Sequence, residues 1–251
     1  MTDIEIIVPI NISGIWYPIY DYDIRKRGSI GLSLVLNPSI LVIPSKKEES
    51  KIIFNGNEIH NFPNLEYLRK LGKIQLNIKS EIPLGFGYGM SGAISLAYAL
   101  ASHELYNINL QEALITAHVS EVLSNNGLGD VIAEYYGGGL VYRKKPGAPG
   151  YGEVEKISVD WDVICSKPIS KESTEILIKT KNENALRYIS EFLSNKTLKN
   201  FFFLSRKFTE ELGFYSPYPN SFRKKGLILR LKECDEGWIK HTPAMNGASV
   251  H

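Results

Sequence analysis

The glycine-rich run at 85–89 is the feature that most limits what this chain can fold into. Glycine stands at every second position, as Gly85, Gly87 and Gly89, and a helical pattern of apolar residues follows over 91–106. Glycine adopts positive φ without steric cost, so such a run lets successive backbone N–H groups approach a ligand closely. The N-terminus of the following helix adds a partial positive charge. The sequence therefore predicts a phosphate-binding loop, and a plain flexible connection is the alternative.

Two familiar kinds of phosphate loop do not fit this segment. No Gly-Lys-Ser or Gly-Lys-Thr follows the glycines, so the loop is not a Walker A motif. The spacing also lacks the third glycine of a dinucleotide-binding fold, and no acidic residue ends a next strand about 20 residues later. What remains is a loop with a hydroxyl, Ser91, at the helix start, where it could coordinate Mg²⁺ between phosphates.

Length and composition narrow the class of protein. With 251 residues the chain has room for one large domain or two lobes that share a core. The net charge of +2 disfavours a nucleic-acid binder, which would be more basic. No stretch of 18 apolar residues and no signal-peptide pattern occurs, so we expect no membrane contact and a cytoplasmic location. Cys165 and Cys234 are too few for a disulfide framework, which favours a reducing compartment.

The pattern of apolar residues and turns predicts a mixed α+β protein. Strands are expected over 4–10, 32–36, 40–43, 51–54, 73–78, 140–143, 238–242 and 249–251, with a turn at 37–39 and a strand pair within 153–165. Helices are expected over 63–71, 91–106, 110–123, 130–136, 183–193 and 198–212. The stretch 223–234 fits either helix or strand, and we favour helix.

The glycine loop resembles the phosphate loop of the GHMP kinase superfamily, Pro-x-x-x-Gly-Leu-x-Ser-Ser-Ala. Pro83, Gly87 and Ser91 fill the Pro, the first Gly and the second Ser of that pattern. Tyr88, Met90 and Gly92 replace its Leu, first Ser and Ala. The resemblance implies that the loop binds the phosphates of ATP through Pro83, Gly85, Gly87, Gly89, Met90, Ser91 and Gly92.

Five further segments, in the same order, resemble motifs of the archaeal pantoate kinases within that superfamily. They lie at 9–16, 28–31, 117–121, 127–131 and 138–149. The resemblance implies a GHMP kinase fold of two lobes with the active site in the cleft between them. We expect an N-terminal lobe over 1–150 that holds the phosphate loop and the catalytic residues, and a short C-terminal lobe over 151–251.

The same resemblance assigns roles to the remaining candidates. Asp130 would orient or deprotonate the acceptor hydroxyl, although a plain helix N-cap is the alternative. Ser91 and Glu121 would bind Mg²⁺. Arg143 would contact the acceptor carboxylate or the transferring phosphoryl group, a surface charge being the alternative. The acceptor site would also include Asn11, Ser13, Ser29 and His118.

The residue pattern supports part of this assignment independently. Leu114 shares one face of the expected helix at 110–123 with His118 and Glu121, and apolar residues also occupy the opposite face. A helix that is apolar on both sides is largely buried, so this histidine and this carboxylate need partners. A site would supply them, although a hydrogen-bonded core histidine is an alternative for His118.

We therefore expect ATP-dependent phosphorylation of D-pantoate to 4-phosphopantoate, a step of coenzyme A biosynthesis, with Mg²⁺ as cofactor and a homodimer by analogy. One alternative is another GHMP kinase, acting on shikimate or homoserine. A second is a non-catalytic GHMP-fold metabolite sensor.

Overall fold

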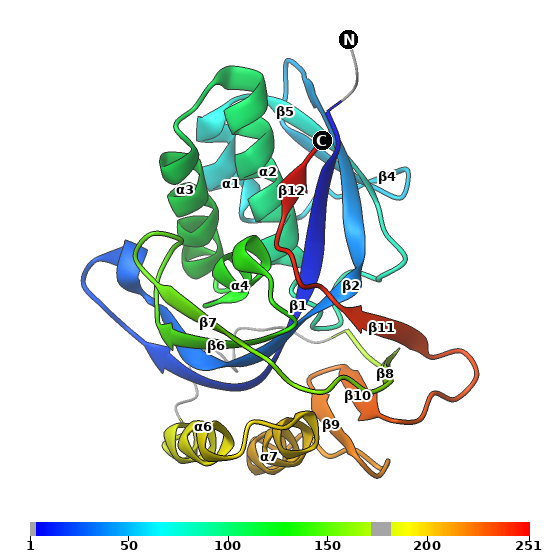
Figure 1. Ribbon diagram of the computed structural model, residues 1–251. Coiled ribbons are helices and arrows are strands. Elements are labelled where there is room, and N and C mark those ends of the chain that lie inside the picture. The colour runs from blue at the N-terminus through cyan, green and yellow to red at the C-terminus, as the bar shows by residue number, and fades with distance from the viewer. Residues whose placement is uncertain (1–3, 172–181) are drawn as a thin grey trace.

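A computed structural model describes residues 4–171 and 182–251 of the chain. Helices α1 to α4 cover one face of the long strands β1 and β2 (Figure 1). Helices α6 and α7 lie at the opposite end of the molecule, next to β9. The strands are β1 (Ile6–Ile19), β2 (Gly28–Lys46), β3 (Lys51–Phe54), β4 (Asn57–Glu58), β5 (Ile74–Lys79), β6 (Leu140–Lys145), β7 (Glu153–Ile157), β8 (Ile164–Pro168), β9 (Ser221–Lys224), β10 (Leu227–Leu231), β11 (Ile239–Pro243) and β12 (Ser249–Val250). The α-helices are α1 (Leu65–Leu68), α2 (Met90–Tyr106), α3 (Leu110–Leu123), α4 (Asp130–Tyr136), α6 (Asn184–Ser194) and α7 (Leu198–Glu211), with 3₁₀ turns η1 (Ile24–Lys26) and η2 (Arg69–Leu71).

The α+β prediction is confirmed, and so are the three helices that follow the glycine loop in the sequence. α3 and α4 have the predicted bounds, and α2 begins one residue earlier than expected, at Met90. In α2 the side chains are buried on nearly every side, which makes it the central helix of the core. The Asn109 side chain caps α3 by accepting a hydrogen bond from the Glu112 N–H, as the sequence pattern indicated.

The long antiparallel hairpin of β1 and β2 differs from the shorter strands that the sequence predicted. β2 continues through the expected turn at 37–39, where the Asn37–Pro38 peptide is cis. Residues 37–39 form a bulge in β2, where the pairing with β1 shifts: Val8 pairs with Ile40, whereas Ile10 pairs with Leu36. The bulge accommodates the proline without ending the strand. The predicted turn was therefore wrong.

Two predictions in the second half were also wrong. Residues 221–231 form the β9–β10 hairpin, in which Lys224 pairs with Leu227, and not a helix. The apolar residues of the hairpin lie in the core against α7. Because the local pattern fits either a helix or a strand, this packing determines that the segment forms strands. β7 and β8 do not pair with each other: β7 joins β6, while β8 joins β10 and β11.

Strands from the end of the chain complete the N-terminal sheet. The main path of the sheet runs β4-β3-β5-β2-β11-β8-β10-β9. β12 pairs with β1 beside it, and β6 and β7 extend from β2. An aromatic cluster joins α6 and α7 to β9. Its rings contact one another edge to face, and they belong to Phe192, Phe201, Phe202 and Phe222.

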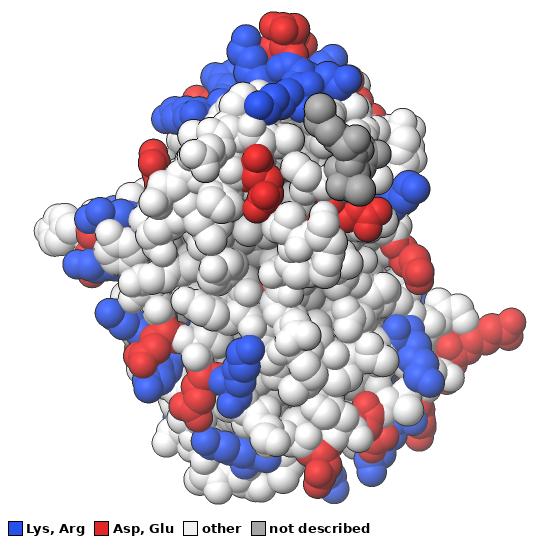
Figure 2. Space-filling view, turned by 45° about the horizontal axis from the view of Figure 1, so that its top comes forward, with Lys and Arg blue, Asp and Glu red and all other residues white. Residues whose placement is uncertain are grey.

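Cys165 and Cys234 are paired as a disulfide, with their Cα atoms 5.6 Å apart. The sequence favoured a reducing compartment and did not predict this pair. It arises because β8 and β10 are neighbours, so the chain that leaves β10 returns to the start of β8. Over the described residues, no helix is long and apolar enough to cross a membrane. Lys, Arg, Asp and Glu side chains are mixed around the rim of the face in Figure 2, and its centre is largely uncharged.

Candidate active site

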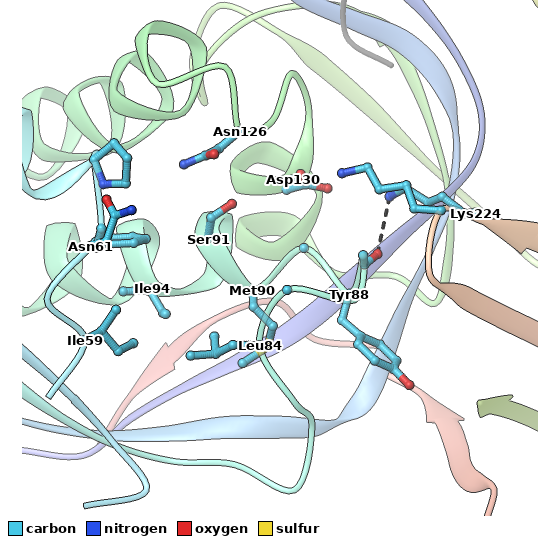
Figure 3. Close-up of a pocket in the computed structure, with 16 residues that line it drawn as sticks. Ile59, Asn61, Leu84, Tyr88, Met90, Ser91, Ile94, Asn126, Asp130 and Lys224 are labelled. Atoms are coloured by element: carbon cyan, nitrogen blue, oxygen red, sulfur yellow. Dashed lines mark hydrogen bonds between the residues drawn. The ribbon is translucent and has the colours of Figure 1, made fainter. Parts of the chain in front are cut away.

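The glycine loop has the backbone that its spacing predicts. Gly85, Gly87 and Gly89 have φ values of +88°, +103° and +75°, in the left-handed region that favours glycine. α2 starts directly after the last of them. The loop and the start of α2 border a cavity of about 350 Å³ (Figure 3). Met90 and Ser91 also line this cavity.

Two residues of the predicted loop lie outside the cavity lining. Pro83 borders a neighbouring surface depression instead. Gly92 faces α4, and a Cβ at this position would lie 2.7 Å from the Cβ of Asp130. Gly92 therefore allows α4 to pack closely on α2, which brings Asp130 next to the loop.

Tyr88 connects the loop to the strands of the second half of the chain. Its hydroxyl lies 2.7 Å from Ser166 Oγ, which lies 2.7 Å from His241 Nε2. His241 Nδ1 lies 2.8 Å from the Asn37 carbonyl oxygen, which can only accept, so Nδ1 carries the proton of the neutral ring. Burial raises the pKa of Tyr88 to about 12 and lowers that of His241 to about 4.

The two predicted Mg²⁺ ligands are in direct contact. Ser91 Oγ donates a hydrogen bond to Glu121 Oε2 at 2.9 Å. Asn64 Nδ2 donates to the other carboxylate oxygen, and Asn126 Nδ2 donates to Asn64 Oδ1 at 2.5 Å. Burial, together with the nearby charge of Asp130, raises the pKa of Glu121 to about 8. Asn64 and Asn126 were not predicted, because isolated asparagines in loops carry no distinguishing pattern.

Asp130 begins α4 and lies beside the same carboxylate. Asn11 Nδ2 donates a hydrogen bond to Asp130 Oδ1 at 2.6 Å. A Cβ added at Gly127 would lie 2.5 Å from Asp130 Oδ2 and 2.7 Å from Glu121 Oε2. Both carboxyl groups therefore converge on this glycine, which leaves the space between them open. The structure brings together Ser91, Glu121 and Asp130, as the sequence predicted.

Arg143 is buried in the middle of β6, which rules out a surface charge. Its guanidinium donates to three serine hydroxyls, Ser33 at 2.6 Å and Ser13 and Ser29 at 3.4 Å. Within the described residues its Nε has no hydrogen-bond partner. Burial lowers the pKa of Arg143 to about 10, although the charge of Asp130 opposes this shift. Among the described residues it is a buried cation that contacts hydroxyl groups and forms no salt bridge with a carboxylate.

His118 is buried, but it borders neither this cavity nor the smaller one described below. Its Nε2 lies 2.8 Å from the carbonyl oxygen of Arg27, two residues before Ser29. Because that carbonyl can only accept, Nε2 carries the proton. Burial lowers the pKa of His118 to about 4, so the ring is neutral near pH 7. Contact between His118 and an acceptor stays a prediction.

Comparison with known proteins identifies the family of the chain. Residues 61–138 match the GHMP kinases N terminal domain family. The chain is 39% identical to a pantoate kinase of Methanocaldococcus jannaschii, in an alignment that covers 75% of this chain and 73% of the relative. The chain belongs to the pantoate kinase family. It is also 29% identical to a pantoate kinase of Methanospirillum hungatei, with 100% and 87% of the two chains covered.

Solved structures share the fold of this pantoate kinase family member. A phosphotransferase related to the coenzyme A biosynthesis pathway superposes with a TM-score of 0.83 at 20% identity, over 99% of this chain and 98% of the other. Mevalonate-3-kinase from Thermoplasma acidophilum superposes with a TM-score of 0.63 at 13% identity, over the same shares of the two chains. These likenesses confirm the predicted GHMP kinase fold.

A second, smaller cavity of about 50 Å³ adjoins the first in this pantoate kinase family member. Ser13 and Ser29 line it, and it shares four lining residues with the larger cavity: Asn126, Asp130, Lys224 and Lys225. The sequence did not predict the two lysines, because a helix over 223–234 gives no reason for their side chains to point inward. Nor did it predict Glu134 of α4, a buried carboxyl with no hydrogen-bond partner within the described residues.

Proposed function

We propose that this protein transfers the γ-phosphoryl group of ATP to the 4-hydroxyl group of D-pantoate, giving 4-phosphopantoate for coenzyme A biosynthesis. The observation that carries the proposal is the meeting of two cavities at Asp130, one under the phosphate loop and one beside Ser13 and Ser29. The family membership supports the reaction, since the curated relatives are pantoate kinases.

The larger cavity suits a nucleotide. Ile59, Leu84 and Ile94 form an apolar end, which Figure 3 shows apart from the polar end at Asn126 and Asp130. A purine base would pack against the apolar end. The phosphates would then lie along the glycine loop, where the backbone N–H groups and the start of α2 favour negative charge.

The smaller cavity suits a hydroxy acid. Arg143 lies next to its walls and is hydrogen-bonded to both Ser13 and Ser29. A buried guanidinium without a carboxylate partner is a strong site for an incoming carboxylate. In this proposal Arg143 and the serines bind the pantoate carboxylate, His118 holds the backbone before Ser29, and the 4-hydroxyl group points toward Asp130.

Asp130 supplies the base. Its Oδ1 accepts a hydrogen bond from Asn11, which leaves Oδ2 available to accept the proton of the attacking hydroxyl. In phosphoryl transfer the protein contributes chiefly positioning and charge neutralisation, so a modest base in a fixed orientation is sufficient. Asn11 is therefore a positioning residue for Asp130.

The residues present also fit a Mg²⁺ ion. Ser91 and Glu121 offer hard oxygen ligands at the end of the phosphate loop, and Glu121 is buried without a cation close to it in the described structure. A bound Mg²⁺ would neutralise phosphate charge there. Asn64 donates a hydrogen bond to the Glu121 carboxylate, and Asn126 in turn donates one to Asn64.

The proposal retains the two lobes of the sequence analysis. Residues 1–150 contain the phosphate loop, Asp130 and the acceptor groups, and residues 151–251 contribute Lys224 and Lys225 to both cavities. We also propose a cytoplasmic homodimer, which size-exclusion chromatography with light scattering would test.

A coupled ADP-release assay with several acceptors tests the function. We expect turnover with D-pantoate and Mg²⁺-ATP. Turnover with homoserine, shikimate or mevalonate but not with pantoate would refute the acceptor, and ATP binding without transfer to any acceptor would indicate a sensor.

Two variants test the mechanism. Asp130→Asn should lower kcat by about 10²–10⁴-fold, the usual contribution of a positioned base, and Asp160→Asn, an exposed aspartate, is its control. Glu121→Ala should raise the Mg²⁺ concentration needed for half-maximal rate, and Glu112→Gln on the exposed face of α3 is the control. Near-normal rates for both Asp130→Asn and Glu121→Ala would refute the mechanism.

A further inference from the structure

Lys224 brings a cation from the second half of the chain into the candidate active site. It is the last residue of β9, directly before the tight turn of the β9–β10 hairpin. Its side chain is buried, with 9% of its surface exposed. It lines the cavity under the phosphate loop as well as the cavity beside Ser13 and Ser29. Lys224 is therefore positioned at the junction where donor and acceptor would meet.

The ammonium group of Lys224 has unused hydrogen-bonding capacity. It donates one hydrogen bond within the described residues, to the Gly87 carbonyl oxygen at 3.4 Å, drawn dashed in Figure 3. An ammonium has three N–H donors, so two remain for a ligand. Gly87 belongs to the phosphate loop, and this contact fixes the ammonium beside the point where phosphate oxygens would lie.

The charges around Lys224 favour an anion in the same place. Burial lowers the pKa of Lys224, while the carboxylate of Asp130 raises it and the Arg143 cation lowers it. Glu134 is close as well, and burial raises the pKa of its carboxyl well above the usual range. Lys224 and Arg143, both buried, feel the charge of Asp130, and among the described residues neither forms a salt bridge with a carboxylate. An incoming phosphoryl group would balance the remaining positive charge.

We propose that Lys224 is a catalytic residue that donates hydrogen bonds to the transferring phosphoryl group, an inference that rests on the proposed function. In that step the bond between the γ-phosphorus and the β–γ bridging oxygen breaks, and its electron pair leaves with ADP. A bond forms between the acceptor oxygen and the γ-phosphorus, and the hydroxyl proton passes to Asp130. Lys224, at the junction of the two cavities, neutralises charge on the phosphoryl oxygens during this transfer.

Lys224→Met tests this role, because it keeps the length and apolar part of the side chain and removes the charge. We expect kcat to fall by about 10²–10³-fold, as for loss of one preorganised donor to developing charge. The KM values for ATP and pantoate should change much less, since the contact strengthens in the transition state. Lys240→Met, which removes the same charge from an exposed position on β11, is the matched control and should keep the wild-type rate.

Binding of ADP with aluminium fluoride, a mimic of the transferring phosphoryl group, supplies a readout that does not depend on turnover. Lys224→Met should bind ADP alone as the wild type does and lose at least tenfold in affinity for ADP with aluminium fluoride and pantoate. Lys224→Arg, which restores the charge, should recover part of both the rate and this affinity. A kcat within threefold of wild type, or equal loss for ADP with and without aluminium fluoride, would overturn the proposal.

The acceptor panel separates this inference from the proposed function. If the wild type phosphorylates homoserine and not pantoate, the proposed acceptor is refuted and the Lys224 variants are measured with homoserine. If the wild type is active and Lys224→Met is equally active with a native circular dichroism spectrum, Lys224 is not catalytic and the proposed function stands.

Discussion

His241 should make this protein less stable in acid, and His241→Gln should remove that part of the acid sensitivity. The neutral ring is buried between Ser166 and the Asn37 carbonyl, and its pKa is about 4. The unfolded chain exposes a histidine whose pKa is about 6.5. The unfolded state therefore binds a proton more readily than the folded state as the pH falls from 6.5 to 4. The sign is destabilisation toward acid, with full stability kept above pH 6.5.

The magnitude follows from the two pKa values. At pH 5 an unfolded histidine is almost fully protonated, whereas the folded His241 is protonated in about one molecule in ten, and the linkage relation gives a loss of about 2 kcal/mol relative to pH 7.5. Glutamine carries no such proton, so the variant should lack this loss. Other titrating groups, including buried His118 and Glu121, are common to both proteins and cancel in the comparison.

Urea unfolding at pH 7.5 and pH 5, followed by circular dichroism, measures the difference. His241→Gln will be less stable than the wild type at pH 7.5 because it repacks a buried site. That gap in unfolding free energy should narrow by about 2 kcal/mol at pH 5. Lys240→Gln, next to it in sequence and exposed, is a control whose gap should be independent of pH. If the difference in unfolding free energy between the wild type and His241→Gln is the same at both pH values to within about 0.5 kcal/mol, the reasoning is refuted. A buried neutral ring with a lowered pKa requires this difference to depend on pH.

Three further predictions concern packing and the loop. Gly127→Ala should lower kcat at least tenfold in the ADP-release assay, because the new methyl group would lie 2.5 Å from Asp130 Oδ2; an unchanged kcat would show that the gap between the carboxylates is not needed. Phe222→Ala should lower the free energy of unfolding in urea by about 3–5 kcal/mol, since this fully buried ring packs in the aromatic cluster. Tyr88→Phe should cost about 1 kcal/mol in the same measurement, because Ser166 loses one hydrogen-bond partner and keeps His241. A loss near zero would mean that the hydroxyl does not anchor the loop.

The sequence predicted those parts of the site that depend on local pattern. The positive φ angles follow from alternating glycines, and the bounds of α3 and α4 follow from a capping residue and from the glycines on either side. The contact between Ser91 and Glu121 was predictable from the family motifs, because the resemblance assigns both residues to one Mg²⁺ ion.

The rest depends on contacts between segments far apart in the chain. Asn64 reaches Glu121 across 57 positions. Lys224 enters the site through a hairpin whose sequence fits a helix equally well, so only its packing against α7 and the sheet decides its direction. The bulge in β2 and the Cys165–Cys234 pair likewise arise from strand neighbours that no local pattern specifies.

In the proposed mechanism, the β1–β2 hairpin carries most of the polar groups of the acceptor side in one short piece of sequence. Asn11, Ser13, Ser29 and Ser33, the polar partners of Asp130 and Arg143, all belong to these two paired strands. The groups that would hold the nucleotide lie elsewhere, on the loop at 83–92 and on α3. Substitutions within about two dozen contiguous residues can therefore change which acceptor is bound. The backbone hydrogen bonds between the two strands remain when side chains on their inner face change. A library confined to residues 11–33 would explore new hydroxy-acid substrates while leaving the phosphoryl donor site intact.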